Sequence, residues 1–225
     1  PYTTLFRSSI GLSCQGEAVV PVDKGYQPLR PVILGMDTRT NAQNEWLQQE
    51  FGNAALFQMT GMPIHTVNTL PKLLWIKEHE PEIWNKASKF LLYEDFIIAQ
   101  MTGKPAISRC MASRTQLYDI HTECWSPEIL AAAGLTSERL SEVFPSGSSI
   151  GTMLPGLADK LGFRSKPVIS TGGHDQACGA LGVGLTEPWL CMDSTGTAEV
   201  VEVALPAPSL TPELEQSDIS VYAHV

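Results

Sequence analysis

The sequence predicts an α/β fold in which helices pack in layers around short sheets. Short apolar runs bounded by turn residues alternate with longer helix-compatible segments along the chain. The apolar run at 167–169 leads through two glycines into a segment of small residues that suits a closely packed helix. With 225 residues, 43% of them hydrophobic, the chain can bury a substantial core and fill one large domain or one and a half.

Strands are expected near the amino terminus. The apolar runs at 10–13 and 18–22 are separated by a polar kink at 15–17, and a turn at 23–25 leads to a third run at 32–34. Their order and spacing predict a β-meander.

The middle of the chain is predicted to be mostly helical. Helix patterns occupy 40–51, 70–78, 81–87, 93–101 and 127–133, with Gly103 and Gly134 as stop signals. A strand at 166–170 and a helix at 176–183 follow, and a hairpin of 189–193 with 199–204 opens another sheet. We therefore expect a second domain to begin around Leu185.

Composition excludes several classes of protein. A net charge of −9 argues against a nucleic-acid surface, because phosphate backbones are held mainly by Lys and Arg. No apolar stretch reaches the ~20 residues that a membrane helix needs, and no segment has the order of a signal peptide. The five cysteines are odd in number and lack a metal-ligand spacing, which predicts reduced thiols in the cytoplasm, no disulfide and no zinc.

Both ends of the sequence are unusual. Residues 1–8, Pro-Tyr-Thr-Thr-Leu-Phe-Arg-Ser, resemble one reading frame of a common sequencing-adapter oligonucleotide and are set aside as non-native. Residues 221–225 have the pattern of a strand that stops in the middle. We expect a fragment that is truncated at both ends.

Asp175 is the candidate catalytic residue. It follows Gly172, Gly173 and His174, so a strand delivers its carboxylate to the mouth of a sheet where glycines leave room for a ligand. The turn at 193–197, Asp-Ser-Thr-Gly-Thr, offers the hydroxyls and backbone donors that receive phosphate. A base beside a phosphate-binding turn suggests a kinase.

Simpler interpretations compete with these. An aspartate in a glycine-rich turn is more often a helix cap or a turn former, and Asp175 could cap the helix that follows. His174 is interpreted as a structural hydrogen-bonding residue rather than a substrate contact. Glu17 lies in an otherwise apolar segment, which favours an inward carboxylate with satisfied hydrogen bonds.

Segments 72–79, 172–184 and 193–197 together resemble the FGGY carbohydrate kinases, which include glycerol, xylulose, gluconate and rhamnulose kinases. The amino-terminal signature of that family is met by Thr69, Lys72 and Trp75 and broken at Val67. The segment 112–125 is especially similar to the glycerol-kinase branch. The resemblance spans 10–225, and it favours a catalytic Asp175 over a simple cap.

The resemblance implies an actin-like, ribonuclease-H-like ATPase fold with the sugar and the phosphates of ATP in a cleft between two domains. Residues 9–184 would be the incomplete sugar-binding domain, and 185–225 would begin the nucleotide-binding domain. The implied reaction is phosphorylation of a sugar or polyol hydroxyl by ATP with Mg²⁺. The residues that match functional positions are Asp175 as general base, Gln15, Glu17 and Gln176 on the substrate, and Gly196 and Thr197 on the nucleotide phosphates; no protein ligand to a metal is assigned.

Departures from the family pattern give conflicting indications of which sugar is the substrate. Gly35 and Val67 stand where glycerol kinases carry Trp and Tyr, so a wider pocket is expected. Gly16 and Glu17 replace the Met-His pair of xylulose kinases, whereas His174 resembles the His-Asp pairing of rhamnulose and fuculose kinases. The first phosphate motif of the family is missing, so the isolated fragment is expected to be inactive.

The sequence fits two other enzyme classes less well. The glycines at 179–184 follow a helix instead of opening one, which argues against a dinucleotide-binding oxidoreductase. The segment 147–151 lacks the strand-to-helix setting of a hydrolase nucleophile. A catalytically silent member of the same fold, which binds sugar as a sensor, stays open, as does homo-oligomerisation.

Overall fold

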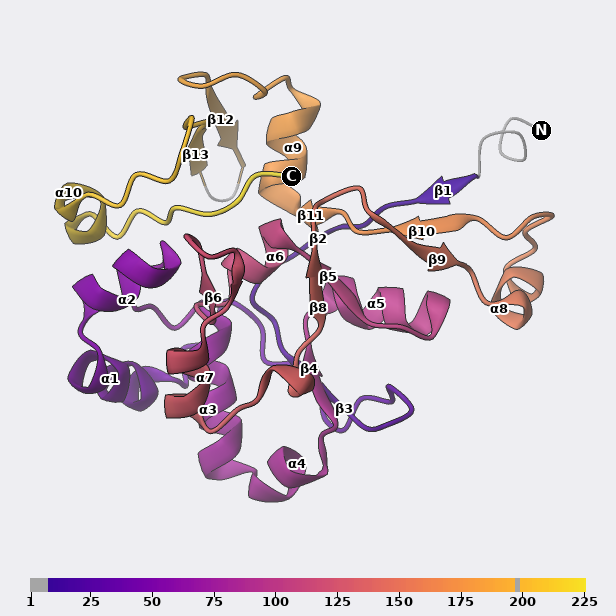
Figure 1. Ribbon diagram of the computed structural model, residues 1–225, viewed down its shortest axis with the longest axis horizontal. Coiled ribbons are helices and arrows are strands. Elements are labelled where there is room, and N and C mark those ends of the chain that lie inside the picture. Colours follow the sequence, from indigo (N-terminus) through magenta and orange to yellow (C-terminus); the bar gives the residue numbers. More distant parts are fainter. Residues whose placement is uncertain (1–7, 197–198) are drawn as a thin grey trace.

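The computed structural model describes residues 8–196 and 199–225 and shows an α/β protein with helices around short sheets (Figure 1). The adapter-like segment, apart from Ser8, and Thr197 of the expected phosphate turn lie outside the described residues. None of the described helices is long and apolar enough to cross a membrane.

The strands are short, and most pair with segments distant in the sequence. In one sheet, β1 (Ser9–Ile10) is parallel to β10 (Val168–Ser170), which is antiparallel to β9 (Ser149–Thr152). The other described strands form pairs: β2 (Ser13–Cys14) with β11 (Gly173–His174), β3 (Val20–Val22) with β4 (Lys89–Leu91), β5 (Ala106–Ser108) with β8 (Glu142–Phe144), β6 (Tyr118–Asp119) with β7 (Cys124–Trp125), and β12 (Cys191–Thr195) with β13 (Glu199–Val203).

The predicted β-meander at the amino terminus is wrong. The first apolar run divides into β1 and β2, and both pair in parallel with strands about 160 residues later in the chain. The second run gives β3, which pairs with β4, and the third run makes only an isolated bridge between Val19 and Ile33. An apolar pattern can identify a strand, but it does not specify the strand with which it pairs. Here β1 and β2 pair in parallel with distant strands and not with their neighbours in the sequence.

The helices that the sequence predicted form close to their expected bounds. They are α1 (Asn41–Glu50), α2 (Asn53–Thr60), α3 (Thr69–His79), α4 (Pro81–Lys86), α5 (Tyr93–Thr102), α6 (Arg109–Ser113), α7 (Pro127–Ala133), α8 (Pro155–Lys160), α9 (Asp175–Gly182), α10 (Pro212–Gln216) and the 3₁₀ turn Ser137–Arg139. In α7, the Ser126 hydroxyl accepts the Ile129 N–H, Pro127 begins the helix, and Gly134 ends it in the left-handed conformation. The sequence did not predict α2, α6, α8 or α10.

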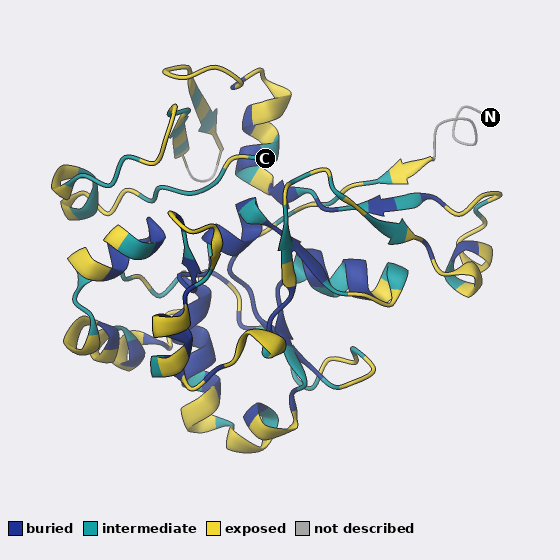
Figure 2. Cartoon of the chain, viewed as in Figure 1, coloured by how far each residue is buried: buried dark blue, intermediate teal, exposed yellow. Residues whose placement is uncertain are grey.

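Two apolar clusters form the frame behind the site. The larger one joins Leu47 of α1, Leu56 of α2, Leu73 of α3 and Ile129 of α7, all fully buried. Another joins Ile98 of α5 to side chains of β5 and β10. Figure 2 shows burial concentrated in α3, α5 and the nearby strands, whereas the β12–β13 hairpin and α10 are largely exposed. The strand ends described below therefore rest on a packed frame.

Candidate active site

The candidate site lies where β2 and β11 end. The two strands are parallel, with Cys14 opposite His174 in the register. Because parallel neighbours end at the same edge of a sheet, the residues that follow them, Gln15 and Asp175, emerge side by side. Gly172, just before β11, packs so tightly that an added Cβ would lie 1.9 Å from the carbonyl oxygen of Leu12. A side chain at this position would prevent the close approach.

Asp175 presents its carboxylate to solvent at this edge. It is the first residue of α9, its side chain is 51% exposed, and its Oδ1 accepts the Gln176 N–H at 2.8 Å. The N-cap position belongs to His174, whose side chain makes no capping bond. Asp175 is thus not the N-cap, and one carboxylate oxygen, Oδ2, has no protein partner among the described residues. Such a carboxylate can accept a proton from a bound alcohol.

The buried imidazole of His174 lies behind the carboxylate. Its Nε2 is 3.4 Å from Asp175 Oδ1, and its backbone N–H donates to Cys110 Sγ at 3.4 Å. Burial, with a smaller contribution from the Arg114 guanidinium, lowers the pKa of His174. Its buried Nδ1 has no hydrogen-bond partner among the described residues. The expectation of a purely structural hydrogen-bonding histidine does not account for this free nitrogen.

Glu17 and Arg114 form a buried ion pair next to His174. The Arg114 Nε and Nη2 atoms lie 2.6 and 2.5 Å from Glu17 Oε1, and the side chains are 14% and 4% exposed. Glu17 has φ of 63°, which is uncommon for a residue with a side chain, and its carbonyl accepts the Thr69 hydroxyl at 3.0 Å. The predicted inward, satisfied carboxylate is confirmed, and its partner Arg114 is a site residue that the sequence did not reveal.

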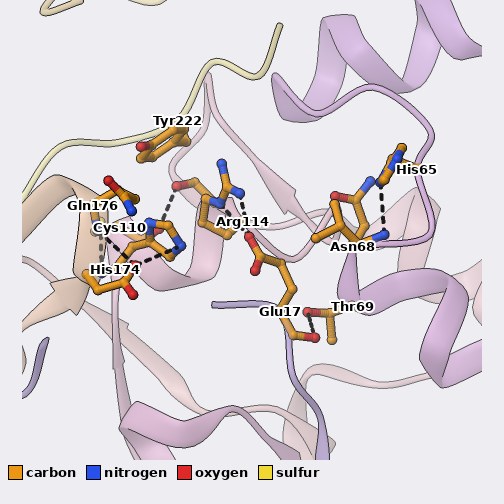
Figure 3. Close-up of polar contacts among 12 residues, drawn as sticks. Glu17, His65, Asn68, Thr69, Cys110, Arg114, His174, Gln176 and Tyr222 are labelled. Carbon is orange, nitrogen blue, oxygen red and sulfur yellow. Dashed lines mark hydrogen bonds and ion pairs between the residues drawn. The ribbon is translucent and has the colours of Figure 1, made fainter. Parts of the chain in front are cut away.

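Tyr222 covers the guanidinium from the opposite side (Figure 3). The Arg114 Cζ lies 4.6 Å from the Tyr222 ring centroid, and the tyrosine ring meets His174 edge to face at 6.1 Å. The Tyr222 hydroxyl donates to the Glu202 carboxylate on β13. Burial raises the pKa of Tyr222. The sequence suggested only a strand here, and nothing in its pattern linked Tyr222 to residues 14–17 or 172–176.

Gln15, Gly35 and Val67 come together on the other side of Glu17. A Cβ built on Gly35 would lie 3.4 Å from Val67 Cγ2, 3.5 Å from Gln15 Nε2 and 3.9 Å from Glu17 Oε2. Position 35 therefore borders two of the predicted substrate-binding side chains. A large side chain at 35 would project into this group, which fits the expectation that glycine here leaves a wider pocket.

Lys72 holds the loop that carries Val67. Its Nζ donates to the carbonyl oxygens of Asn68, at 2.9 Å, and of Val67. The side chain is fully buried, and burial lowers the pKa of Lys72 to about 8. These contacts give Lys72 a structural role at the start of α3.

The structure gathers most of the predicted site residues but not all of them. Glu17 pairs with Arg114, Asp175 lies beside His174, Gln15 and Glu17 both border position 35, and the half-buried Gln176 follows Asp175. Gly196 is exposed at the bend after β12, a strand that extends through Thr195 and so takes up part of the expected turn. Within the described ranges no three or more His, Cys, Asp or Glu side chains are grouped to hold a metal ion.

Comparison with known proteins identifies relatives of this chain. A family model described as the FGGY family of carbohydrate kinases, N-terminal domain, matches residues 7–182. The xylulose kinase of Bacillus subtilis (strain 168) is 35% identical over 192 residues, which are 85% of this chain and 38% of that protein. The L-fuculokinase of Haemophilus influenzae is 31% identical over 193 residues, 85% of this chain and 40% of that protein.

A solved structure agrees with these sequence matches. The crystal structure of a xyloylose kinase from Brucella ovis has a TM-score of 0.85 and 28% identity, and the match covers 92% of this chain and 42% of that one. The chain thus spans about two fifths of the length of the relatives it matches.

Proposed function

Since the chain belongs to the FGGY family of carbohydrate kinases, we propose that it supplies the sugar-binding side and the general base of an ATP-dependent sugar or polyol kinase. The predicted α/β, actin-like fold of that family is confirmed. One observation carries the proposal: the Asp175 carboxylate is half exposed at a strand edge, directly beside a buried cluster of polar side chains.

In the proposed reaction, a sugar hydroxyl lies within hydrogen-bond distance of Asp175 Oδ2. Its oxygen attacks the γ-phosphorus of ATP, the proton passes to the Asp175 carboxylate, and the bond to the leaving ADP breaks. Burial lowers the pKa of His174, which favours the uncharged form of the imidazole beside the base. Gln15, Glu17 and Gln176 are proposed to bind the other hydroxyls of the sugar, which fixes the reacting oxygen at Asp175.

The nucleotide is proposed to arrive as its Mg²⁺ complex. Gly196 and Thr197 are proposed to bind its phosphates through a backbone N–H and a hydroxyl. Mg²⁺ neutralises charge on the phosphates in transfers of this kind. We further propose a domain boundary at 184/185, with 185–225 beginning the nucleotide-binding domain, and a cytoplasmic location.

The test is sugar-dependent release of ADP by a full-length protein that contains this chain. The relatives named xylulose kinase and L-fuculokinase place ketopentoses and deoxyhexuloses first in the panel, followed by glycerol and sugar acids. We expect one class to be phosphorylated, and Asp175→Asn to lower kcat by ~10² or more with little change in KM. Asp159→Asn, an exposed aspartate on α8, is the control.

A catalytically silent, sugar-binding member of the family is the second candidate. The unpartnered Nδ1 of His174 and the Arg114–Glu17 pair would serve sugar binding equally well without transfer. Calorimetric binding of a sugar with no ADP release would support this candidate and remove the kinase proposal. Unchanged turnover in Asp175→Asn would remove Asp175 as the base.

A further inference from the structure

Glu94 lies at the start of α5 and joins two segments of the site. Its side chain is fully buried. Its Oε1 accepts the Gly172 N–H at 2.7 Å, and its Oε2 accepts the Ser108 N–H at 2.7 Å. The two oxygens thus bind backbone groups that are 64 residues apart in the sequence.

Each of those backbone groups leads directly to a site residue. Ser108 is the N-cap of α6, and Arg114 is the C-cap residue of the same short helix. Gly172 precedes β11, which ends at His174, and Asp175 follows. The two segments also touch where the His174 N–H donates to Cys110 Sγ. Glu94 therefore connects, through two backbone hydrogen bonds, the segment that leads to Arg114 with the segment that leads to Asp175.

We propose that Glu94 is a positioning residue for phosphoryl transfer, whose carboxylate ties the α6 N-terminus to Gly172 and so fixes Asp175 relative to Arg114 and Glu17. This rests on the proposed kinase function. Both oxygens face N–H donors, so the bridge needs two acceptors, which an ionised carboxylate supplies and an amide does not. A base displaced by about 1 Å can lose ~10² in rate, which makes this link matter for turnover.

Glu94→Gln is the sharpest variant, because it keeps the shape but turns an NH₂ group towards one of the two N–H donors. Asp95→Asn is its matched control. Asp95 is the adjacent, equally buried carboxylate, but it accepts the Leu92 N–H and the Ser141 hydroxyl, which lie outside the site. Both variants replace one buried carboxylate by an amide on the same helical turn.

Steady-state kinetics in the full-length protein test the link, at temperatures well below the unfolding midpoint of each variant. We expect Glu94→Gln to lower kcat by ~10-fold to 10² with KM for the sugar changed less than about 3-fold, and Asp95→Asn to retain wild-type kcat. In an Asp175→Asn background, Glu94→Gln should have little further effect, since it acts through the base. Equal kcat losses in Glu94→Gln and Asp95→Asn, or full additivity with Asp175→Asn, would overturn the proposal.

Hydrogen exchange separates this proposal from the kinase function itself. Peptides covering 170–178 should exchange at least ~10-fold faster in Glu94→Gln than in wild type or Asp95→Asn, whether or not any sugar is phosphorylated. Unchanged protection of these peptides would show that Glu94 does not hold the segment. Absent ADP release with faster exchange would instead refute the kinase assignment and leave the structural link in place.

Discussion

Arg114 directs two N–H groups at a single oxygen of Glu17, with Nε at 2.6 Å and Nη2 at 2.5 Å. The pair is buried, and the guanidinium also lies over the ring of Tyr222, with its Cζ 4.6 Å from the ring centroid. Glu17 keeps this arrangement although its backbone is in the left-handed region. Backbone strain of this kind persists where surrounding contacts demand it and often marks a functional position.

Loss of the Glu17 charge should be costly for stability. Glu17→Gln leaves the Arg114 guanidinium buried without a counter-ion, so the free energy of unfolding should fall by about 3–5 kcal/mol. Urea denaturation of the full-length protein measures this. Glu17→Gln combined with Arg114→Met should be less destabilised than Glu17→Gln alone, because it removes the unpaired charge. Glu142→Gln, an exposed site on β8, should behave as wild type; wild-type stability of Glu17→Gln would contradict the prediction.

Gly16 should tolerate no side chain, because His174 occupies the adjacent space. A Cβ at position 16 would lie 2.8 Å from His174 Cδ2 and 3.3 Å from its Nε2, and the buried ring has little room to move. Gly16→Ala should displace the imidazole beside Asp175 and lower kcat by ~10-fold or more. Gly156→Ala on α8, where nothing lies within 4 Å, is the control and should keep full turnover. Equal kinetics of the two variants would show that the His174 position does not matter for turnover.

The absence of a side chain at Gly35 should determine how large a sugar the site can bind. Gly35→Leu would project a side chain among Val67, Gln15 and Glu17 and take up space proposed for the sugar. We expect KM for the preferred sugar to rise ~10-fold, with a smaller change in kcat, because the loss falls on binding. Steady-state kinetics with a five-carbon and a three-carbon acceptor measure the effect, which should be larger for the longer one. Gly156→Leu is the size-matched control, and a KM unchanged by Gly35→Leu would place the sugar elsewhere.

Asp95 should make stability depend on pH in the acid range. Burial raises the pKa of Asp95 from 3.8 to about 7, so between these values the folded protein holds a proton that the unfolded chain has lost. The Asp95 contribution to the free energy of unfolding therefore falls as pH rises from about 4 to 7. Asp95→Asn should remove this fall, which is on the order of a few kcal/mol.

Denaturant midpoints of wild type and Asp95→Asn across pH 4–8 provide the measurement. The difference between the two curves reports Asp95 together with its interaction with the neighbouring Glu94, because titrating groups far from position 95 affect both proteins alike. Asp159→Asn, an exposed aspartate on α8, should follow the wild-type curve. Parallel curves for wild type and Asp95→Asn would mean that Asp95 keeps an ordinary pKa in the folded protein.

Local structure was largely predictable. The sequence-predicted helices at 127–133 and 176–183 match α7 and α9 to within a residue at each end, and the hairpin at 189–204 formed as expected. Caps, stop glycines and apolar periodicity act within a few residues, so the sequence displays them directly. The short strands β4 to β9 and β11 were missed, because runs of two to four residues carry little periodic signal.

The sequence by itself determined the family, Asp175 as the candidate base, and the helices α1, α3, α4, α5, α7 and α9, since each rests on a local pattern or on motifs in order. Only the tertiary structure decided that β2 pairs with β11, that Arg114 neutralises Glu17, and that Glu94 ties Gly172 to Ser108. The residues that these contacts bring together lie 64 to 160 positions apart in the sequence. They meet only when the chain has folded. Burial and parallel pairing are properties of the packed molecule, and no short segment encodes them alone.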